Sequence, residues 1–141
     1  MKPEEGLTRP VHSGSCLCGQ VRYELTSDIK STSHCHCSMC RKAHGAAFAT
    51  YASVLKEAHS FTGGSQLLAS YASSTEVTRT FCSVCGSPML WHSKGEFADW
   101  VSFPLATLDT PYTPPKQRHI HLASRAPWFQ IEHGWPQSDA Y

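Results

Sequence analysis

The chain has 141 residues and a formal net charge of +1, which predicts a single domain over residues 1–141 with one hydrophobic core. Charged residues make up only 16% of the sequence, so it lacks the basic surface that binds nucleic acid or an anionic membrane. No apolar run follows Lys2, as a secretory signal requires, and no stretch approaches the roughly 18 apolar residues of a membrane helix. We therefore expect a soluble, cytoplasmic protein.

Short apolar runs that predict β-strands follow one another along the chain, separated by glycine and proline turn signals. They are residues 21–25, 48–52, 67–71, 77–81, 89–91 and 100–103. One helical turn is expected over residues 38–44, ending at Gly45, and another after Pro127. Four prolines in residues 104–117 predict an extended loop. The fold class that follows is mainly β, with mostly antiparallel sheets and short helical turns.

Seven cysteines form three groups at spacings typical of metal sites. They are Cys16-x-Cys18, Cys35-x-Cys37-x-x-Cys40 and Cys82-x-x-Cys85-Gly86. A reducing compartment disfavours structural disulfides, and an odd number of cysteines cannot pair completely. Gly86 allows the tight turn through which a C-x-x-C pair faces one metal ion. The pattern therefore predicts two zinc ions per chain rather than a set of inert buried thiols.

The favoured partition of the cysteines is four plus three, because it completes one site and leaves only small loops to close in the other. The first site is expected to be structural and consists of Cys16, Cys18, Cys82 and Cys85. The second site consists of Cys35, Cys37 and Cys40. Three protein ligands and one open position are typical of catalytic zinc. Spacing alone also permits another grouping, in which both C-x-C pairs share one ion.

Three histidines close to the second site are candidates for a fourth ligand. On a strand, His34 and His36 face away from the cysteines beside them, which makes them poor candidates. His44 lies one turn after Cys40 and is the ligand to expect if the site is closed. We favour an open position, with His44 as a packing or surface residue.

Several segments carry a more specific signal: Gly-Ser-Cys-Leu-Cys-Gly-Gln-Val-Arg-Tyr at 14–23, Cys-His-Cys-Ser-Met-Cys-Arg-Lys at 35–42 and Phe-Cys-Ser-Val-Cys-Gly-Ser-Pro at 81–88. His-Ile-His-Leu-Ala-Ser at 119–124 and Ala-Pro-Trp at 126–128 follow. Together they resemble the glutathione-dependent formaldehyde-activating enzyme family, which includes centromere protein V. The resemblance covers a core of about residues 13–136.

The resemblance implies a zinc-bearing β-tent of small antiparallel sheets. It also implies that the four-cysteine set holds a structural zinc and that Cys35, Cys37 and Cys40 hold the catalytic one. The family reaction makes or breaks a carbon–sulfur bond, as glutathione adds to formaldehyde to give S-hydroxymethylglutathione. His44 departs from the pattern, because many relatives have a small residue there.

Zinc removes the proton of a bound thiol, whose free pKa is about 8.5. We expect the substrate sulfur to occupy the open position as a thiolate and to attack the aldehyde carbon. Arg41 and Lys42 are candidates for contact with the carboxylates of glutathione, and His44 is a candidate donor to the developing alkoxide. One alternative is a zinc-stabilised binding module without catalysis. Another, nucleic-acid or cytoskeletal binding, is disfavoured by the near-neutral charge.

Overall fold

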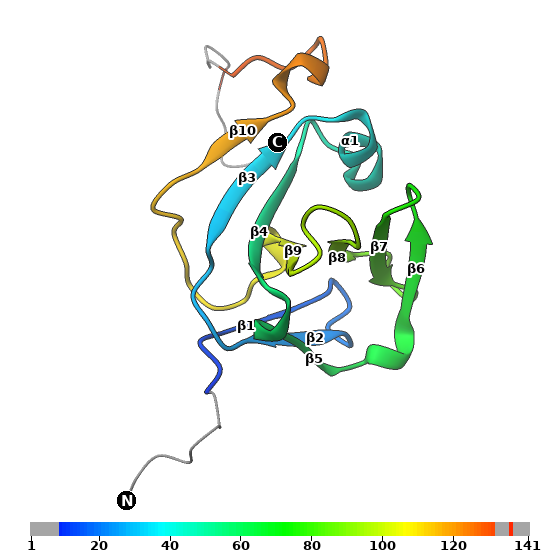
Figure 1. Ribbon diagram of the computed structural model, residues 1–141, viewed down its shortest axis with the longest axis vertical. Helices are drawn as coiled ribbons and strands as arrows, with labels where there is room; N and C mark the ends of the chain where they lie inside the picture. The colour runs from blue at the N-terminus through cyan, green and yellow to red at the C-terminus, as the bar shows by residue number, and fades with distance from the viewer. Residues whose placement is uncertain (1–8, 132–135, 137–141) are drawn as a thin grey trace, which may run out of the picture.

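The computed structural model describes residues 9–131 and residue 136. Two β-sheets dominate this part of the chain (Figure 1). The smaller sheet has the strand order β1-β2-β5, with bounds β1 His12–Ser15, β2 Arg22–Leu25 and β5 His59–Gly63. The larger has the order β10-β3-β4-β9-β8-β7-β6, with bounds β10 Arg118–Ile120, β3 Ser31–Cys35, β4 Ala49–Leu55, β9 Trp100–Pro104, β8 Pro88–Ser93, β7 Val77–Cys82 and β6 Leu68–Ala72.

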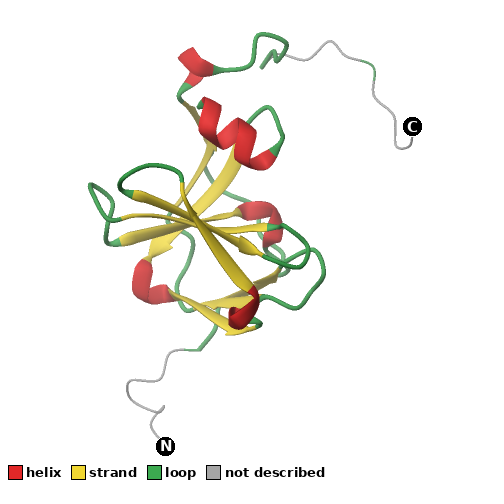
Figure 2. Cartoon of the chain, turned by 90° about the vertical axis from the view of Figure 1, so that its right-hand side faces the viewer, coloured by secondary structure: helices red, strands yellow, loops and turns green. Residues whose placement is uncertain are grey.

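The helical elements are short and lie at the ends of strands, as Figure 2 shows. They are the α-helix α1 at Ser38–His44 and the 3-10 turns η1 Lys56–Ala58, η2 Ser65–Leu67, η3 Leu105–Thr107 and η4 Leu122–Ser124. Within the described ranges, none of them is long and apolar enough to cross a membrane. Together with the two sheets, they confirm the prediction of a mainly β fold with short helical turns.

Each predicted strand overlaps an observed one, namely β2, β4, β6, β7, β8 and β9. The helix predicted over residues 38–44 is also present with those bounds. The helical turn expected after Pro127 is smaller than predicted, because it consists of one backbone hydrogen bond from Phe129 N–H to Ala126 O. No apolar run indicated the other four strands, β1, β3, β5 and β10, although the expected orientation of His34 rests on an extended backbone there.

Helix α1 begins and ends at residues whose chemistry suits those positions. Cys37 has extended backbone angles at the N-cap, and its Sγ accepts a hydrogen bond from the backbone N–H of Cys40. Gly45 follows the last turn in the left-handed conformation, with φ 60°, and its N–H donates to Arg41 O. The helix is therefore held between a cysteine cap and a glycine cap.

Alternation along the larger sheet separates its two faces. On β4, Ala52 and Val54 are fully buried in the core, whereas Tyr51 and Ser53 lie on the opposite face and line a cavity. The same alternation on β9 buries Val101 and Phe103 and places Trp100 and Ser102 on the cavity face. One face of the sheet therefore builds the core, and the other is available for a site.

The smaller sheet covers the core face of the larger one. Tyr23 on β2 is fully buried, its ring lies 5.3 Å from that of Phe103, and its hydroxyl is 2.8 Å from the Thr107 hydroxyl. A Cβ at Gly14 would overlap the Tyr23 ring, so only glycine permits this approach. The contact fixes the β1–β2 hairpin against the larger sheet.

Strand β10 is parallel to β3, unlike the other paired strands in the described ranges. The register sets Ile120 beside Cys35, and the N–H of His36 donates to Ile120 O at 3.0 Å. Figure 1 shows β10 alongside β3 at the edge of the sheet, near α1. The C-terminal segment is therefore tied to the strand that delivers Cys35.

Candidate metal centres and the adjoining cavity

The structure brings four cysteines together where two hairpins meet. This four-cysteine cluster consists of Cys16, Cys18, Cys82 and Cys85, whose sulfur atoms all lie within 4.8 Å of one another. The Sγ atoms of Cys16 and Cys18 are 3.5 Å apart, and those of Cys18 and Cys82 are 3.9 Å apart. A tetrahedral zinc with Zn–S bonds of about 2.3 Å holds its sulfurs about 3.8 Å apart. The donor set and its spacing therefore fit zinc.

Tight turns present these sulfurs. Cys16 follows β1, and a turn closed by the hydrogen bond from Gly19 N–H to Cys16 O carries Cys18. Cys82 ends β7, and Gly86, with φ 81°, donates to Cys82 O across the next turn. Because a turn starts directly after Cys16, Cys16 and Cys18 do not lie on one extended segment.

Ser87 joins the two hairpins beside the cluster. Its hydroxyl accepts a hydrogen bond from the backbone N–H of Leu17 at 2.9 Å and lies 3.3 Å from Cys85 Sγ. Hydrogen bonding with Ser87 lowers the pKa of the Cys85 thiol to about 5. A thiol with a low pKa is readily present as the thiolate that binds metals.

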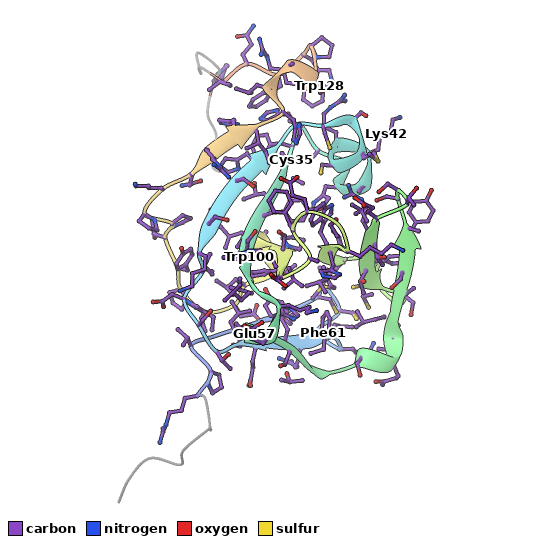
Figure 3. The ribbon with its side chains drawn as sticks, viewed as in Figure 1. Cys35, Lys42, Glu57, Phe61, Trp100 and Trp128 are labelled. Atoms are coloured by element: carbon purple, nitrogen blue, oxygen red, sulfur yellow. The ribbon has the colours of Figure 1, made fainter. Side chains whose placement is uncertain are left out.

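The second group, the three-cysteine cluster, lies where β3 runs into α1. It consists of Cys35, Cys37 and Cys40, whose sulfurs also lie within 4.8 Å of one another. Cys35 ends β3, Cys37 caps the helix, and Cys40 lies in its first turn. Figure 3 labels Cys35 at the end of β3 beside α1. Three thiols that converge without a fourth cysteine fit a metal ion with one further position.

Arg79 on β7 connects this cluster to its surroundings. Its guanidinium donates from Nη2 to Cys40 Sγ at 3.7 Å, from Nη1 to the Tyr51 hydroxyl at 3.2 Å and from Nε to the Ser73 hydroxyl at 3.0 Å. The hydrogen bond with Cys35, and then Arg79, lowers the pKa of Cys40 to about 5. A positive group therefore stabilises negative charge on this cluster.

His44 does not join the three-cysteine cluster. Its Nε2 lies 3.1 Å from the Tyr51 hydroxyl, and among the described residues the thiols of the cluster have no histidine within their group. Burial, and then Arg79, lowers the pKa of His44, so the ring is neutral at pH 7. The structure thus places His44 behind Tyr51, where it orients that side chain.

His34 and His36 face away from the cysteines, as alternation predicts. The ring of His34 lies between the Thr50 hydroxyl and the Gln117 side chain. The ring of His36 is fully buried, with its Nε2 at 2.8 Å from His119 Nδ1. These residues join the β3 segment to the β10 segment. The cysteines of the three-cysteine cluster face the opposite side, where the cavity lies.

A cavity of about 710 Å³ lies on the open face of the larger sheet, and all three residues of the three-cysteine cluster line it. Its basic side chains are Lys30, Arg79 and Arg118. Arg41 and Lys42, the predicted carboxylate contacts, are not among its lining residues: Arg41 Nε donates to His36 O, and Figure 3 shows Lys42 on the outer side of α1. Lys30, Arg79 and Arg118 therefore replace Arg41 and Lys42 as the candidates for contact with a substrate carboxylate.

Sequence reasoning missed Arg79 and Tyr51, which line the cavity together with the cysteines. Both lie in strands that the apolar pattern indicated correctly. The usable signal was a single arginine within the apolar alternation of residues 77–81. Its partners lie on β4, on α1 and in the β6–β7 turn, and the local pattern does not identify them.

A family model described as glutathione-dependent formaldehyde-activating enzyme matches residues 11–124. An uncharacterised lyase of Schizosaccharomyces pombe is 29% identical over 80 residues, which are 57% of this chain and 56% of that protein. The match therefore spans little more than half of that relative.

A crystal structure of a Rhodobacter sphaeroides protein, a structural-genomics target, superposes with a TM-score of 0.61. Its sequence identity is 22%, and the match covers 76% of this chain and 98% of that chain. This likeness shows the fold. Because the family model spans most of the chain and all seven cysteines, the protein belongs to the glutathione-dependent formaldehyde-activating enzyme family.

Proposed function

We propose that the protein is a zinc-dependent carbon–sulfur lyase that adds a small thiol, such as glutathione, to formaldehyde or a related aldehyde. The observation that carries the proposal is the convergence of Cys35, Cys37 and Cys40 at the wall of a large cavity. The family and the name of the S. pombe lyase support the same reaction class.

The two cysteine clusters have different roles in this proposal. The four-cysteine cluster would hold a structural zinc, because its sulfurs supply a complete tetrahedral set. The three-cysteine cluster would hold the catalytic zinc. Zinc supplies a Lewis acid there, which keeps a thiol deprotonated at neutral pH.

The addition itself needs no oxidant. The thiol sulfur forms a bond to the aldehyde carbon, and the π pair of the carbonyl moves to its oxygen. That oxygen takes up one proton, which balances the proton lost by the thiol, and the product is a hemithioacetal. The protein must therefore stabilise negative charge on one oxygen.

Arg79 is the residue that can supply this stabilisation. Arginine has five N–H donors, and the contacts to Ser73, Tyr51 and Cys40 use three of them. The remaining donors belong to a side chain that lines the cavity beside the cluster. Tyr51, held between Arg79 and His44, keeps the guanidinium in place.

Cobalt substitution and an activity assay test the proposal together. Glutathione added to the cobalt-loaded protein should strengthen the sulfur-to-metal charge-transfer band, whereas S-methylglutathione, which cannot form a thiolate, should leave it unchanged. The zinc-loaded protein should speed adduct formation between glutathione and formaldehyde above the uncatalysed rate, and Cys37→Ser should abolish the acceleration. If no thiol changes the spectrum and no rate increases, the protein is a zinc-stabilised binding module.

A further inference from the structure

The cavity beside the three-cysteine cluster would hold both the thiol and the aldehyde of the proposed reaction, and it is far larger than formaldehyde. Its volume is about 710 Å³, whereas formaldehyde is hardly bigger than a water molecule, whose share of liquid volume is about 30 Å³. Cavities of this size hold drug-sized molecules. Resting on the proposed function, we propose that the aldehyde partner is an aromatic aldehyde that also carries a carboxylate.

Aromatic side chains and small residues shape a slot for a ring. Ser31, Ser53 and Ser102 are paired in register across β3, β4 and β9. The row continues into Trp91 on β8 and Arg79 on β7, and all five residues line the cavity. Serines beside an indole leave space above the sheet that a flat group fills. Aromatic groups stack or meet edge to face in such a slot.

Two further aromatic residues enclose the slot. Trp100 on β9 and Phe97, which is 54% exposed, line the same cavity. Figure 3 labels Trp100 on the sheet, farther from α1 than Cys35. Neither formaldehyde nor glutathione offers an apolar ring to these side chains. The aromatic group therefore belongs to the other substrate.

The charges of the cavity favour an anion. Its basic lining residues are Lys30, Arg79 and Arg118. Among the described residues, 30–121, that line it, none is acidic. Because Arg79 contacts the cysteine cluster, Lys30 and Arg118 are the basic residues that remain for a carboxylate farther along, and of these Arg118 is on β10, beside the strand that delivers Cys35. Arginine binds carboxylates with two parallel hydrogen bonds.

The distance along the strand from the level of Cys35 to the level of Arg118 is comparable to the length of one substituted ring. Ile120 is beside Cys35 in the parallel pairing of β10 and β3, and Arg118 lies two residues earlier, beside Ser33. Two residues of strand cover about 7 Å, comparable to a benzene ring with substituents at opposite ends. An aldehyde carbon at the level of Cys35 along the strand would set a para carboxylate at the level of Arg118.

The test compares 4-carboxybenzaldehyde, benzaldehyde and formaldehyde as partners of glutathione with the zinc-loaded protein, using exchange NMR to measure adduct formation. We expect kcat/KM for 4-carboxybenzaldehyde to exceed that for each of the other two by at least about tenfold. If formaldehyde is the best of the three, the aromatic inference is wrong while the proposed function stands.

Two variants test which residues produce the preference for 4-carboxybenzaldehyde over formaldehyde. Arg118→Gln and Trp91→Ala should each lower kcat/KM for 4-carboxybenzaldehyde about tenfold more than they lower it for formaldehyde. The matched controls are Arg125→Gln and Trp128→Ala, since neither residue lines the cavity, and they should leave the ratio unchanged. An unchanged ratio in Arg118→Gln and Trp91→Ala would overturn the inference.

Binding of 4-methylbenzoate separates the inference from the proposed function, because this probe keeps the ring and the carboxylate but lacks the aldehyde. It should quench tryptophan fluorescence, acetate should not, and Arg118→Gln should raise its Kd about tenfold. Such binding without turnover of any aldehyde would refute the lyase and retain the ligand class. Absence of binding, together with no preference among the aldehydes, would refute the ligand class.

Discussion

Arg79 contacts a thiol of the three-cysteine cluster, a buried hydroxyl and a loop serine through one guanidinium. Replacing it with glutamine removes the charge and most of the donors. Loss of a donor to a developing oxyanion typically costs about 10²–10³ in kcat, so Arg79→Gln should lower kcat by about 10². Stopped-flow or exchange-NMR kinetics at saturating thiol measure this loss.

Arg22→Gln is the matched control for this prediction, because Arg22 is exposed on β2 in the other sheet. It should leave kcat unchanged. Zinc content and melting temperature of both variants should match those of the wild type. If Arg79→Gln retains full kcat, or if its loss is explained by missing zinc, Arg79 is a structural residue rather than an oxyanion donor.

His59 makes folding sensitive to mild acid. Its ring stacks on Tyr23 at 5.0 Å, its Nε2 has no partner among the described residues, and burial lowers its pKa from 6.5 to about 4. Between these values the unfolded chain binds more protons than the folded one, so the free energy of unfolding falls as the pH drops. Above about pH 6.5 the residue adds no pH dependence.

The expected loss from this histidine between pH 7 and pH 5 is about 2 kcal/mol. His59→Phe, which keeps an aromatic ring beside Tyr23, should remove it. Urea unfolding of both proteins at the two pH values measures the difference, and acid release of zinc, common to both, cancels in the comparison. Equal pH dependence in the two proteins would show that the His59 ring is not buried as a neutral group.

At the level of elements, sequence patterns predicted the strands and the helix that depend on interactions between neighbouring residues. The alternation of residues 77–81 and the glycine after residues 38–44 predicted β7 and α1, because side-chain alternation and the Gly45 cap are properties of neighbouring residues. The apolar pattern did not indicate β3, because Ser31–His34 is polar. This polarity is explained by the structure, since one face of β3 lines the cavity.

The candidate site could be predicted only in part, because some of its residues are neighbours in sequence and others meet only in the folded sheet. Cys35, Cys37 and Cys40 are close in sequence, so their spacing indicated the cluster directly. Arg79 and Trp91 reach the cavity through pairing across β7, β8 and β9. That pairing depends on tertiary register, which a single sequence does not reveal.

At the scale of the whole molecule, the two cysteine clusters connect very different lengths of chain. The four-cysteine cluster joins the β1–β2 turn of the smaller sheet to the β7–β8 turn of the larger one, across more than 60 residues of sequence. The three-cysteine cluster spans only the end of β3 and the first turn of α1. Metal loss from the first should therefore loosen the contact between the sheets.

This difference predicts that the four-cysteine cluster determines stability, whereas the three-cysteine cluster determines activity. Cys85→Ser should abolish soluble expression or lower the melting temperature sharply, because binding energy at a structural zinc is folding energy. Cys40→Ser should keep the melting temperature close to that of the wild type and abolish activity. Circular dichroism melts and zinc content per chain measure both effects, with about one zinc retained in Cys40→Ser. A larger drop in melting temperature for Cys40→Ser than for Cys85→Ser would show that the assignment of structural and catalytic sites is reversed.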